Sequence, residues 1–135
     1  MVAFNKFYPF VALLHNGGYT LSSDTIKVML SNTAPTTSNA VKSDITEISA
    51  GNGYAAGGTA LSGVTSTQTG GTYTLNSANL TVVTATGAVG PFRYPVLYDA
   101  TTNNLLGYYD NGSSITLVNT ETFTLTFSGG IFTCV

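Results

Sequence analysis

A helical pattern of hydrophobic and polar positions occurs near the start of the chain. The large side chains that share one helical face there are Phe4, Phe7, Tyr8, Val11 and Leu14. Asn5 is the expected N-cap, and Pro9 shifts the regular part of the helix toward its C-terminal half. The triplet Asn16-Gly17-Gly18 supplies a stop signal. The pattern predicts a short α-helix within residues 1–18 that lies on an apolar surface.

Beyond this segment the hydrophobic pattern has a period of two, which indicates β-strands. The first such run, DTIKVMLSN (24–32), alternates Ile26, Val28 and Leu30 with Thr25, Lys27 and Met29. A long polar connection follows over residues 33–50, in which Ile45 and Ile48 fit one helical turn. The segment AGNGYAAGGTAL (50–61) is rich in glycine and small residues, which predicts an extended arm or an irregular edge strand.

The second half of the chain shows one strand pattern after another. FRYPVLY is expected to place Phe92, Tyr94, Val96 and Tyr98 on one face, and TFTLTF to turn Phe123, Leu125 and Phe127 inward. Asn111-Gly112 is a strong hairpin signal, which predicts that LLGYYD pairs with SITLV. Short strands between Gly, Asn and Asp turns predict an all-β fold over residues 1–135: a single antiparallel β-sandwich or jelly-roll-like domain with a short N-terminal α-helix.

The composition is unusual for its lack of charge. Of 135 residues, 43% are hydrophobic but only 7% are charged, against about 25% in an ordinary soluble domain. Threonine, serine, asparagine and glycine must therefore cover the surface. The net charge is -2, and the basic residues, which form no run, are Lys6, Lys27, Lys42 and Arg93. Nucleic acid is excluded as an expected partner because its binding needs clustered phosphate contacts.

The sequence lacks the features that identify membrane-spanning, secreted and cysteine-rich metal-binding proteins. There is no run of about 20 apolar residues to cross a membrane, and the first residues lack the pattern expected of a cleavable signal peptide. Cys134 is the only cysteine, which excludes an internal disulfide and a cysteine-rich metal site. We expect Cys134 to be a small, nearly buried residue of the last strand.

Candidate reactive groups are few. His15, the only histidine, lies at the expected helix end, where capping of the last carbonyls is the favoured role over catalysis. Asp99 and Asp110 flank DATTNNLLGYYD and are the best candidates for a hydrolytic pair or a calcium site, although turn hydrogen bonds are favoured for both. GNGYAA (51–56) matches the dinucleotide fingerprint without its strand–helix context. The sequence predicts no enzyme, cofactor or metal site.

Aromatic residues and the single arginine are the best candidates for an interface. The tyrosines that lie on neighbouring predicted strands are Tyr94, Tyr98, Tyr108 and Tyr109. They suit a sugar-binding platform or a protein interface, although the favoured interpretation is that half of the aromatic residues fill the core. Arg93 is expected to point outward, toward a carboxylate of a neighbouring subunit or partner. Pro91 and Pro95 each lack a backbone donor, which predicts an edge strand here or positions that are paired on one side only.

Three blocks of the chain carry a resemblance to a known family. They are the helix ending near LLHNGG, then SSDTIKVMLSNTAPTTSNAVKSDITEISAGNGYAAGG, then GPFRYPVLYDATTNNLLGYYDNGSSITLVNTETFTLTFSGGIFTCV. Together they span nearly the whole chain, which resembles small virion structural proteins of tailed bacteriophages and prophages. Pro9 departs from the more charged and regular helix usual in that family.

The resemblance implies a capsid decoration (cement) protein that binds the outside of the major capsid lattice, as a trimer, and stabilises the head. It implies location on the virion surface after synthesis in the host cytoplasm, and the major capsid protein as partner. The alternative is a tail, fibre or receptor-binding module that recognises host glycans. The residues expected at an interface are Phe4, Phe7, Tyr8, Tyr54, Arg93, Tyr94 and Tyr108.

Overall fold

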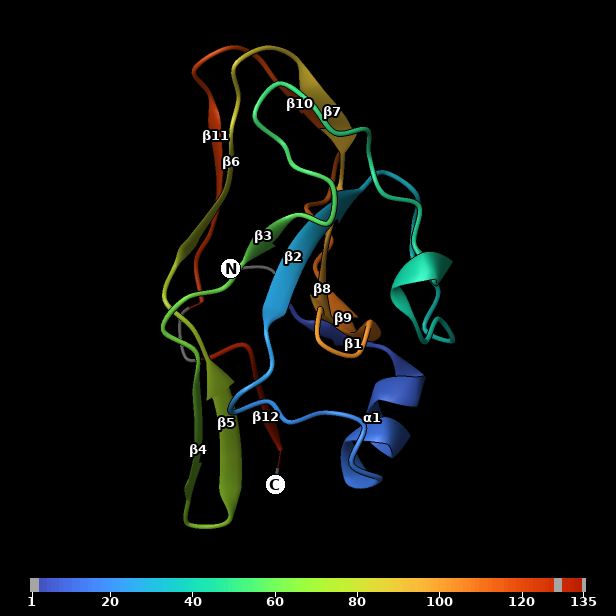
Figure 1. Cartoon of the computed structure of the whole chain (residues 1–135), viewed down its shortest axis with the longest axis vertical. Helices are drawn as coiled ribbons and strands as arrows, with labels where there is room; N and C mark the ends of the chain where they lie inside the picture. Colours follow the sequence, from blue (N-terminus) through green and yellow to red (C-terminus); the bar gives the residue numbers. More distant parts are fainter. Residues whose placement is uncertain (1–2, 128–129, 135) are drawn as a thin grey trace.

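The computed structural model describes residues 3–127 and 130–134. The fold is all-β, an antiparallel β-sandwich with one short α-helix, as predicted (Figure 1). The elements in chain order are β1 (Asn5–Lys6), α1 (Tyr8–His15), β2 (Ile26–Ser31), the 3-10 turn η1 (Lys42–Asp44), β3 (Thr59–Ala60), β4 (Thr65–Thr69), β5 (Thr72–Asn76), β6 (Leu80–Thr84), β7 (Val89–Phe92), β8 (Tyr94–Asp99), β9 (Asn104–Tyr108), β10 (Ile115–Leu117), β11 (Thr122–Leu125) and β12 (Phe132–Cys134). Residues 1, 2, 128, 129 and 135 of the predicted domain lie outside the described residues.

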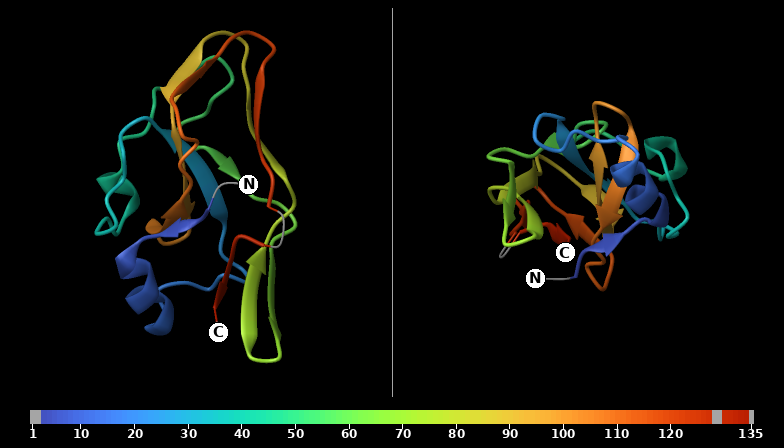
Figure 2. Two further views of the ribbon diagram at one scale, coloured as in Figure 1. Left: turned by 180° about the vertical axis from the view of Figure 1, so that it is seen from behind. Right: turned by 90° about the horizontal axis from the view of Figure 1, so that it is seen from below.

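A five-stranded sheet forms the centre of the molecule, in the order β1-β9-β8-β2-β3. Strands β6 and β11 lie on one side of it and the η1 segment on the other (Figures 1 and 2). Both faces of β2 and β8 are therefore covered, and nearly every residue of these two strands is buried. Met29, predicted to lie on the face opposite to Ile26, Val28 and Leu30, is also fully buried, beneath the η1 segment.

For Pro95 the predicted edge strand is wrong, but the alternative prediction, a position with a register partner on one side only, is correct. It lies in β8, which pairs with β2 on one side and β9 on the other. Pro95 is the second residue of β8, beyond the last residue of β9, and its carbonyl accepts the Tyr109 N–H at 2.9 Å. A missing donor is tolerated at such a strand end.

The helix begins later than predicted, and it buries a different face. Asn5 belongs to the short strand β1, and Phe7, rather than Asn5, is the N-cap. Phe10 is the buried residue of α1, whereas Tyr8 and Val11, both placed on the predicted face, are exposed. The predicted stop is confirmed, because Gly17 adopts a positive φ of 78° and the Gly18 N–H donates to the Leu13 carbonyl at 2.7 Å.

The remaining strands form three smaller sheets, in the orders β10-β7, β11-β6 and β12-β5-β4. The predicted hairpin at Asn111-Gly112 is wrong: β10 pairs with β7, and β9 pairs with β8 through the turn after Asp99. The predicted single face of FRYPVLY is also interrupted. Phe92 ends β7 and packs on Phe123, while the other residues of that face belong to β8 in the central sheet. For TFTLTF the inward residues are confirmed.

The Gly-rich segment is an edge strand and not an extended arm. Its strand β3 pairs with β2, and Tyr54 within it is buried. Gly58 has a φ of 79°, and a Cβ there would run into the carbonyl of Val28. Glycine at this position lets the segment lie directly against the backbone of β2.

Candidate functional site

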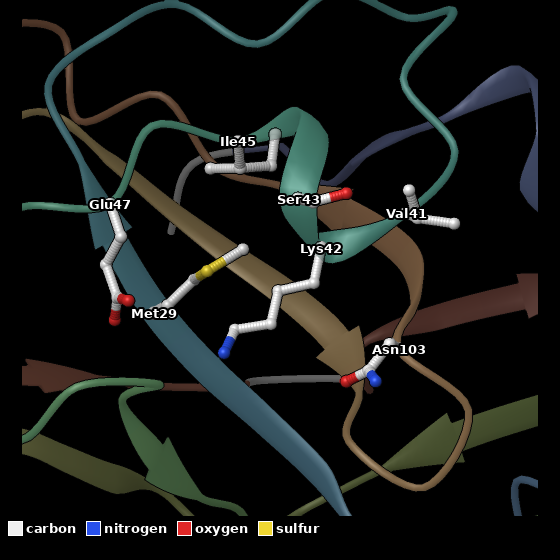
Figure 3. Close-up of a pocket in the computed structure, with 7 residues that line it drawn as sticks. All are labelled: Met29, Val41, Lys42, Ser43, Ile45, Glu47 and Asn103. Carbon is white, nitrogen blue, oxygen red and sulfur yellow. The ribbon is translucent and has the colours of Figure 1, made fainter.

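One pocket, of about 390 Å³, lies between the η1 segment and the central sheet (Figure 3). The residues that line it are Met29, Val41, Lys42, Ser43, Ile45, Glu47 and Asn103. In Figure 3 the Glu47 side chain lies over the ribbon of β2, Met29 extends from β2 toward Ile45, and Lys42 reaches from η1 toward β2. Lys42 and Glu47 are its charged members, and the partners of both are set by the fold.

Glu47 holds the Gly-rich segment in place. Its Oε2 accepts the Tyr54 hydroxyl at 2.6 Å and the Gly57 N–H at 2.7 Å. The Tyr54 oxygen in turn accepts the Leu30 N–H of β2 at 3.0 Å. Burial, followed by the hydrogen bond to Glu47, raises the pKa of Tyr54 far above its usual value. Glu47 is thus a structural acceptor, and Tyr54 remains a neutral donor.

The Lys42 side chain is also held by a contact within the chain. Its Nζ lies 5.4 Å from the ring centroid of Tyr98, a cation–π distance. The Tyr98 hydroxyl donates to the Gly57 carbonyl at 2.6 Å, and burial raises the pKa of Tyr98. Among the described residues, Ser43 carries the one hydroxyl of the lining, and the structure shows no hydrogen bond from it to a histidine or carboxylate. The lining therefore lacks a nucleophile with an adjacent base, the arrangement that covalent catalysis uses.

The other candidate reactive groups are dispersed. His15 donates from Nδ1 to the Val11 carbonyl at 2.7 Å at the end of α1, as the capping interpretation predicts. Asp99 is at the turn end of the β8–β9 hairpin and Asp110 follows the opposite end, so they form no facing pair. Asp99 Oδ1 accepts the N–H groups of Thr101 at 2.9 Å and Thr102 at 3.3 Å, which are the turn bonds that the sequence favoured.

The structure instead brings Asp99 against Asp24, a contact that the sequence analysis missed. Asp99 is fully buried, and its Oδ2 has no hydrogen-bond partner among the described residues. Burial, followed by the nearby Asp24 carboxyl group, raises the pKa of Asp99 to about 7. The Asp99 carboxyl group, followed by the Thr20 N–H, lowers the pKa of Asp24. The surroundings of Asp99 therefore favour its protonated form. A long-range register, with Ile26 opposite Asp99, creates the contact.

Arg93 finds its carboxylate within the chain, which corrects the expectation of a partner's carboxylate. Its Nε donates to Asp110 Oδ1 at 2.7 Å and its NH2 to Oδ2 at 3.1 Å. The guanidinium also lies 5.3 Å from the ring centroid of Tyr94. The hydrogen bonds from Arg93 lower the pKa of Asp110. This fork joins the start of β8 to the end of β9 and leaves both side chains partly exposed.

The predicted interface residues separate into buried and exposed groups. Phe7 and Tyr54 are core residues, with 0% and 3% of their surface exposed, so their side chains are not available to a partner. The tyrosine platform is also divided: Tyr98 and Tyr109 are buried, whereas Tyr94 and Tyr108 are half-buried. The last two pack edge to face at 6.2 Å. Phe4 is half-buried against Tyr109 and Phe132.

One end of the molecule gathers exposed apolar groups around α1 and β12. Tyr8 is 66% exposed and Val11 40% exposed on α1. A hollow of about 550 Å³ lies on one side of β12, lined by Phe4, Asn5, Lys6, Tyr8, Phe10, Thr37, Ile131, Phe132 and Thr133. A second, of about 270 Å³, lies between α1 and the strands β4 and β5, lined by Leu14, Tyr19, Leu21, Ser22, Ser66, Tyr73 and Cys134. Cys134 is exposed, which corrects its expected burial.

The hairpin of β4 and β5, here called the ribbon (residues 65–76), projects at the same end of the molecule (Figures 1 and 2). All five residues of β4 are exposed, and Leu75 is the buried residue of β5. The ribbon sequence TSTQTGGTYTLN contains no charged residue. Gly70 and Gly71 both have positive φ, 58° and 85°, which forms the tight type I′ turn at its tip.

Among residues 3–127 and 130–134, no three His, Cys, Asp or Glu side chains are grouped so that they would hold a metal ion. No helix in this part of the chain is long and apolar enough to cross a membrane. Compared with known proteins, the chain matches no family model, no curated protein and no solved structure. The end of the molecule formed by α1, β12 and the ribbon is therefore put forward as the candidate site on its own geometry.

Proposed function

We propose that the chain is a non-enzymatic structural protein of a bacteriophage virion, a decoration protein that binds the outside of the major capsid lattice. The resemblance of its sequence to small phage virion proteins motivates the proposal. The low charge supports it, because an uncharged Thr- and Gly-rich surface loses little solvation free energy when a partner covers it. As that resemblance implies, the major capsid protein is the proposed partner and a trimer the proposed state.

The observation that carries the proposal is the exposed end formed by α1, β12 and the ribbon. Tyr8 and Val11 present apolar surface on α1, and the hollows beside β12 have mixed apolar and polar linings. Protein interfaces bury such a central apolar cluster, with an aromatic anchor, inside a polar rim. The ribbon, Thr-rich and uncharged, supplies a polar surface next to it.

The competing functions have less support from the geometry. The charged groups at the pocket of Figure 3 are engaged within the chain: Glu47 holds the Gly-rich segment, and Lys42 covers the Tyr98 ring. The tyrosine platform offers little surface for glycan recognition, because two of its four side chains, Tyr98 and Tyr109, are buried. The binding of a protein lattice through uncharged surface is therefore the function that we propose.

Cosedimentation with capsids tests the proposal. The heads are those of the phage that encodes the chain, assembled without it, and the protein is added in purified form. The informative variant is Val11→Asp, which introduces a charge into the proposed contact. Val118→Asp is the matched control, because Val118 is also exposed, at 58%, and directly follows β10. Strand β10 lies at the end of the molecule opposite to α1 (Figure 1).

We expect wild-type protein and Val118→Asp to bind alike, and Val11→Asp to bind at least about tenfold more weakly. Truncation of residues 1–15 is a poorer test, because Phe7 and Phe10 belong to the core. Failure of the wild-type protein to bind heads would contradict the decoration role. Equal binding by both valine variants would contradict the assignment of the capsid contact to the end of the molecule formed by α1, β12 and the ribbon.

A further inference from the structure

The outer edge of β4 is an unpaired strand edge. In its sheet, of order β12-β5-β4, β4 is the last strand. Its pairing with β5 is regular along all five residues, from Thr65 opposite Asn76 to Thr69 opposite Thr72. Such an edge presents backbone donors and acceptors at the spacing of a further strand.

The turn determines which backbone groups face outward. A type I′ turn at Gly70-Gly71 closes on a hydrogen-bonded pair, which here is Thr69 with Thr72. Pairs in an antiparallel ladder alternate between hydrogen-bonded and not. Thr67 therefore bonds inward to β5, whereas the N–H and C=O groups of Ser66 and Gln68 point away from β5.

The edge of β4 also lacks the features that protect other strand edges of the molecule. Natural edges are protected by shortness, proline, charge or bulges. Strands β1 and β3 have two residues each, β7 contains Pro91, and the β10–β7 and β11–β6 pairs have irregular registers. Strand β4 has five residues, no proline, no charge and a regular register.

From this edge we propose that β4 pairs antiparallel with β4 of a second copy of this chain, so that two three-stranded sheets join into one. The proposal concerns the purified protein alone and does not depend on the decoration role.

The hydrogen-bonding pattern of the edge favours a second copy as the partner. In a register centred on Thr67, Ser66 of each copy lies opposite Gln68 of the other. These are the residues whose backbone groups point outward, so both copies form reciprocal pairs of backbone hydrogen bonds. Thr67 then lies opposite Thr67, and Thr65 opposite Thr69. Threonine pairs across strands are favourable, and no like charges meet.

The contact is expected to be weak. Two five-residue strands bury less surface than the roughly 1,200–2,000 Å² of a stable interface. We therefore expect monomers in dilute solution and dimers at high concentration. Neighbouring copies held side by side by any other contact would pair far more completely, because their effective concentration rises.

Cross-linking through cysteine tests the register directly. In a Cys134→Ser background, which removes the exposed native thiol, Thr67→Cys places two thiols across the two-fold axis. Thr65→Cys is the matched control, because Thr65 lies opposite Thr69 and far from its own copy. We expect oxidation to cross-link Thr67→Cys at least about tenfold faster than Thr65→Cys, since disulfides form at Cα separations of about 4.4–6.8 Å. Equal rates for the two variants would overturn the proposal.

A second pair of variants tests the backbone bonds. Gln68→Pro removes an outward N–H without touching the bonds to β5, and Gln68→Ala keeps that N–H. We expect light scattering at high concentration to show dimers for Gln68→Ala and at least about tenfold weaker association for Gln68→Pro. A circular-dichroism spectrum like that of the wild type confirms that each variant is folded. A folded Gln68→Pro that associates as strongly as Gln68→Ala would overturn the pairing, as would a monomeric wild type at every concentration.

Discussion

The central sheet and the ribbon are built from the same kind of secondary structure but differ in what covers them. Strands β2 and β8 have neighbours on both edges and both faces, and nearly all their side chains are buried. Strand β4 has one neighbour and no buried residue. The free energy of folding therefore comes mainly from the sheet. The ribbon is free to serve contacts outside the chain.

The difference is also visible in the sequences of the two regions. Val28, Leu30 and Leu97 supply branched apolar side chains to the sheet, where close packing decides stability. The ribbon has threonine, serine and glutamine instead, which favour extended backbone without needing burial. Substitutions in the two regions should accordingly separate stability from association.

The largest contrast is expected from truncations to alanine. Leu97→Ala removes a fully buried side chain from β8 and should lower the free energy of unfolding by about 2–5 kcal/mol. Thr67→Ala in β4 changes an exposed side chain and should alter it by less than about 0.5 kcal/mol. Urea unfolding followed by circular dichroism measures both. Comparable losses would contradict the division between sheet and ribbon.

Glycine substitutions separate backbone strain from steric conflict. Gly58 and Gly70 both have positive φ, so alanine is strained at either position. At Gly58 the new Cβ also meets the carbonyl of Val28, whereas nothing lies within 4 Å of it at Gly70. Gly58→Ala should therefore cost about 1–3 kcal/mol more than Gly70→Ala in the same unfolding assay. Equal costs would mean that the Gly-rich segment does not lie tightly on β2.

The Asp24–Asp99 pair predicts a dependence of stability on pH. The pKa of Asp99 is about 7 in the folded chain, above its usual value of 3.8. Folding therefore favours the protonated form, so the contribution is fully present below about pH 4 and is lost as the pH rises through about 7. The titration of Asp24, whose pKa is lowered, affects stability only at pH values below this range.

Asp99→Asn is the matched variant, because the amide has nearly the shape of the carboxyl group but no titrating proton. Unfolding at pH 5 and pH 8 should show a loss of stability at the higher pH for the wild type and a smaller loss for Asp99→Asn. An identical pH dependence in the two proteins would show that Asp99 is not the group that titrates.

The smallest effect is expected at Arg93. Its ion pair with Asp110 is partly exposed, so water and salt screen it. Arg93→Ala should lower the melting temperature only slightly, and the difference should shrink further at high salt. A double-mutant cycle with Asp110→Asn isolates the pair. A large, salt-independent loss would mean that Arg93 contributes through its packing on Tyr94 instead.

Much of the fold could be predicted from local pattern. The period-two runs predicted the strands β2 and β11, and the Asn-Gly-Gly stop predicted the end of α1. Pairing between distant strands was not predictable, because a turn signal reports only on its neighbours. Asn111-Gly112 follows β9, yet the strand after it pairs with β7.

The same limit applied to the candidate site. Arg93 meets Asp110, and Asp99 meets Asp24, through the registers of the central sheet, and neither contact has a short-range signal. The prediction of which aromatic residues are exposed was also partly wrong, because a helical or alternating pattern does not distinguish a core face from an exposed one. Phe7 and Tyr54 are in the core, whereas Tyr8, next to Phe7, is exposed.

Amide hydrogen exchange tests the division between a stabilising sheet and a contact-forming ribbon most directly. The comparison is between dilute protein and protein bound to a partner copy or capsid. We predict slow exchange at Val28 and Leu97 in both states, and slow exchange at Thr67, whose N–H bonds to β5, relative to its neighbours. Ser66 and Gln68 should exchange fast in dilute protein and become protected on binding. Amides of Ser66 and Gln68 that are already protected in dilute protein, or that stay unprotected in the bound state, would contradict the account.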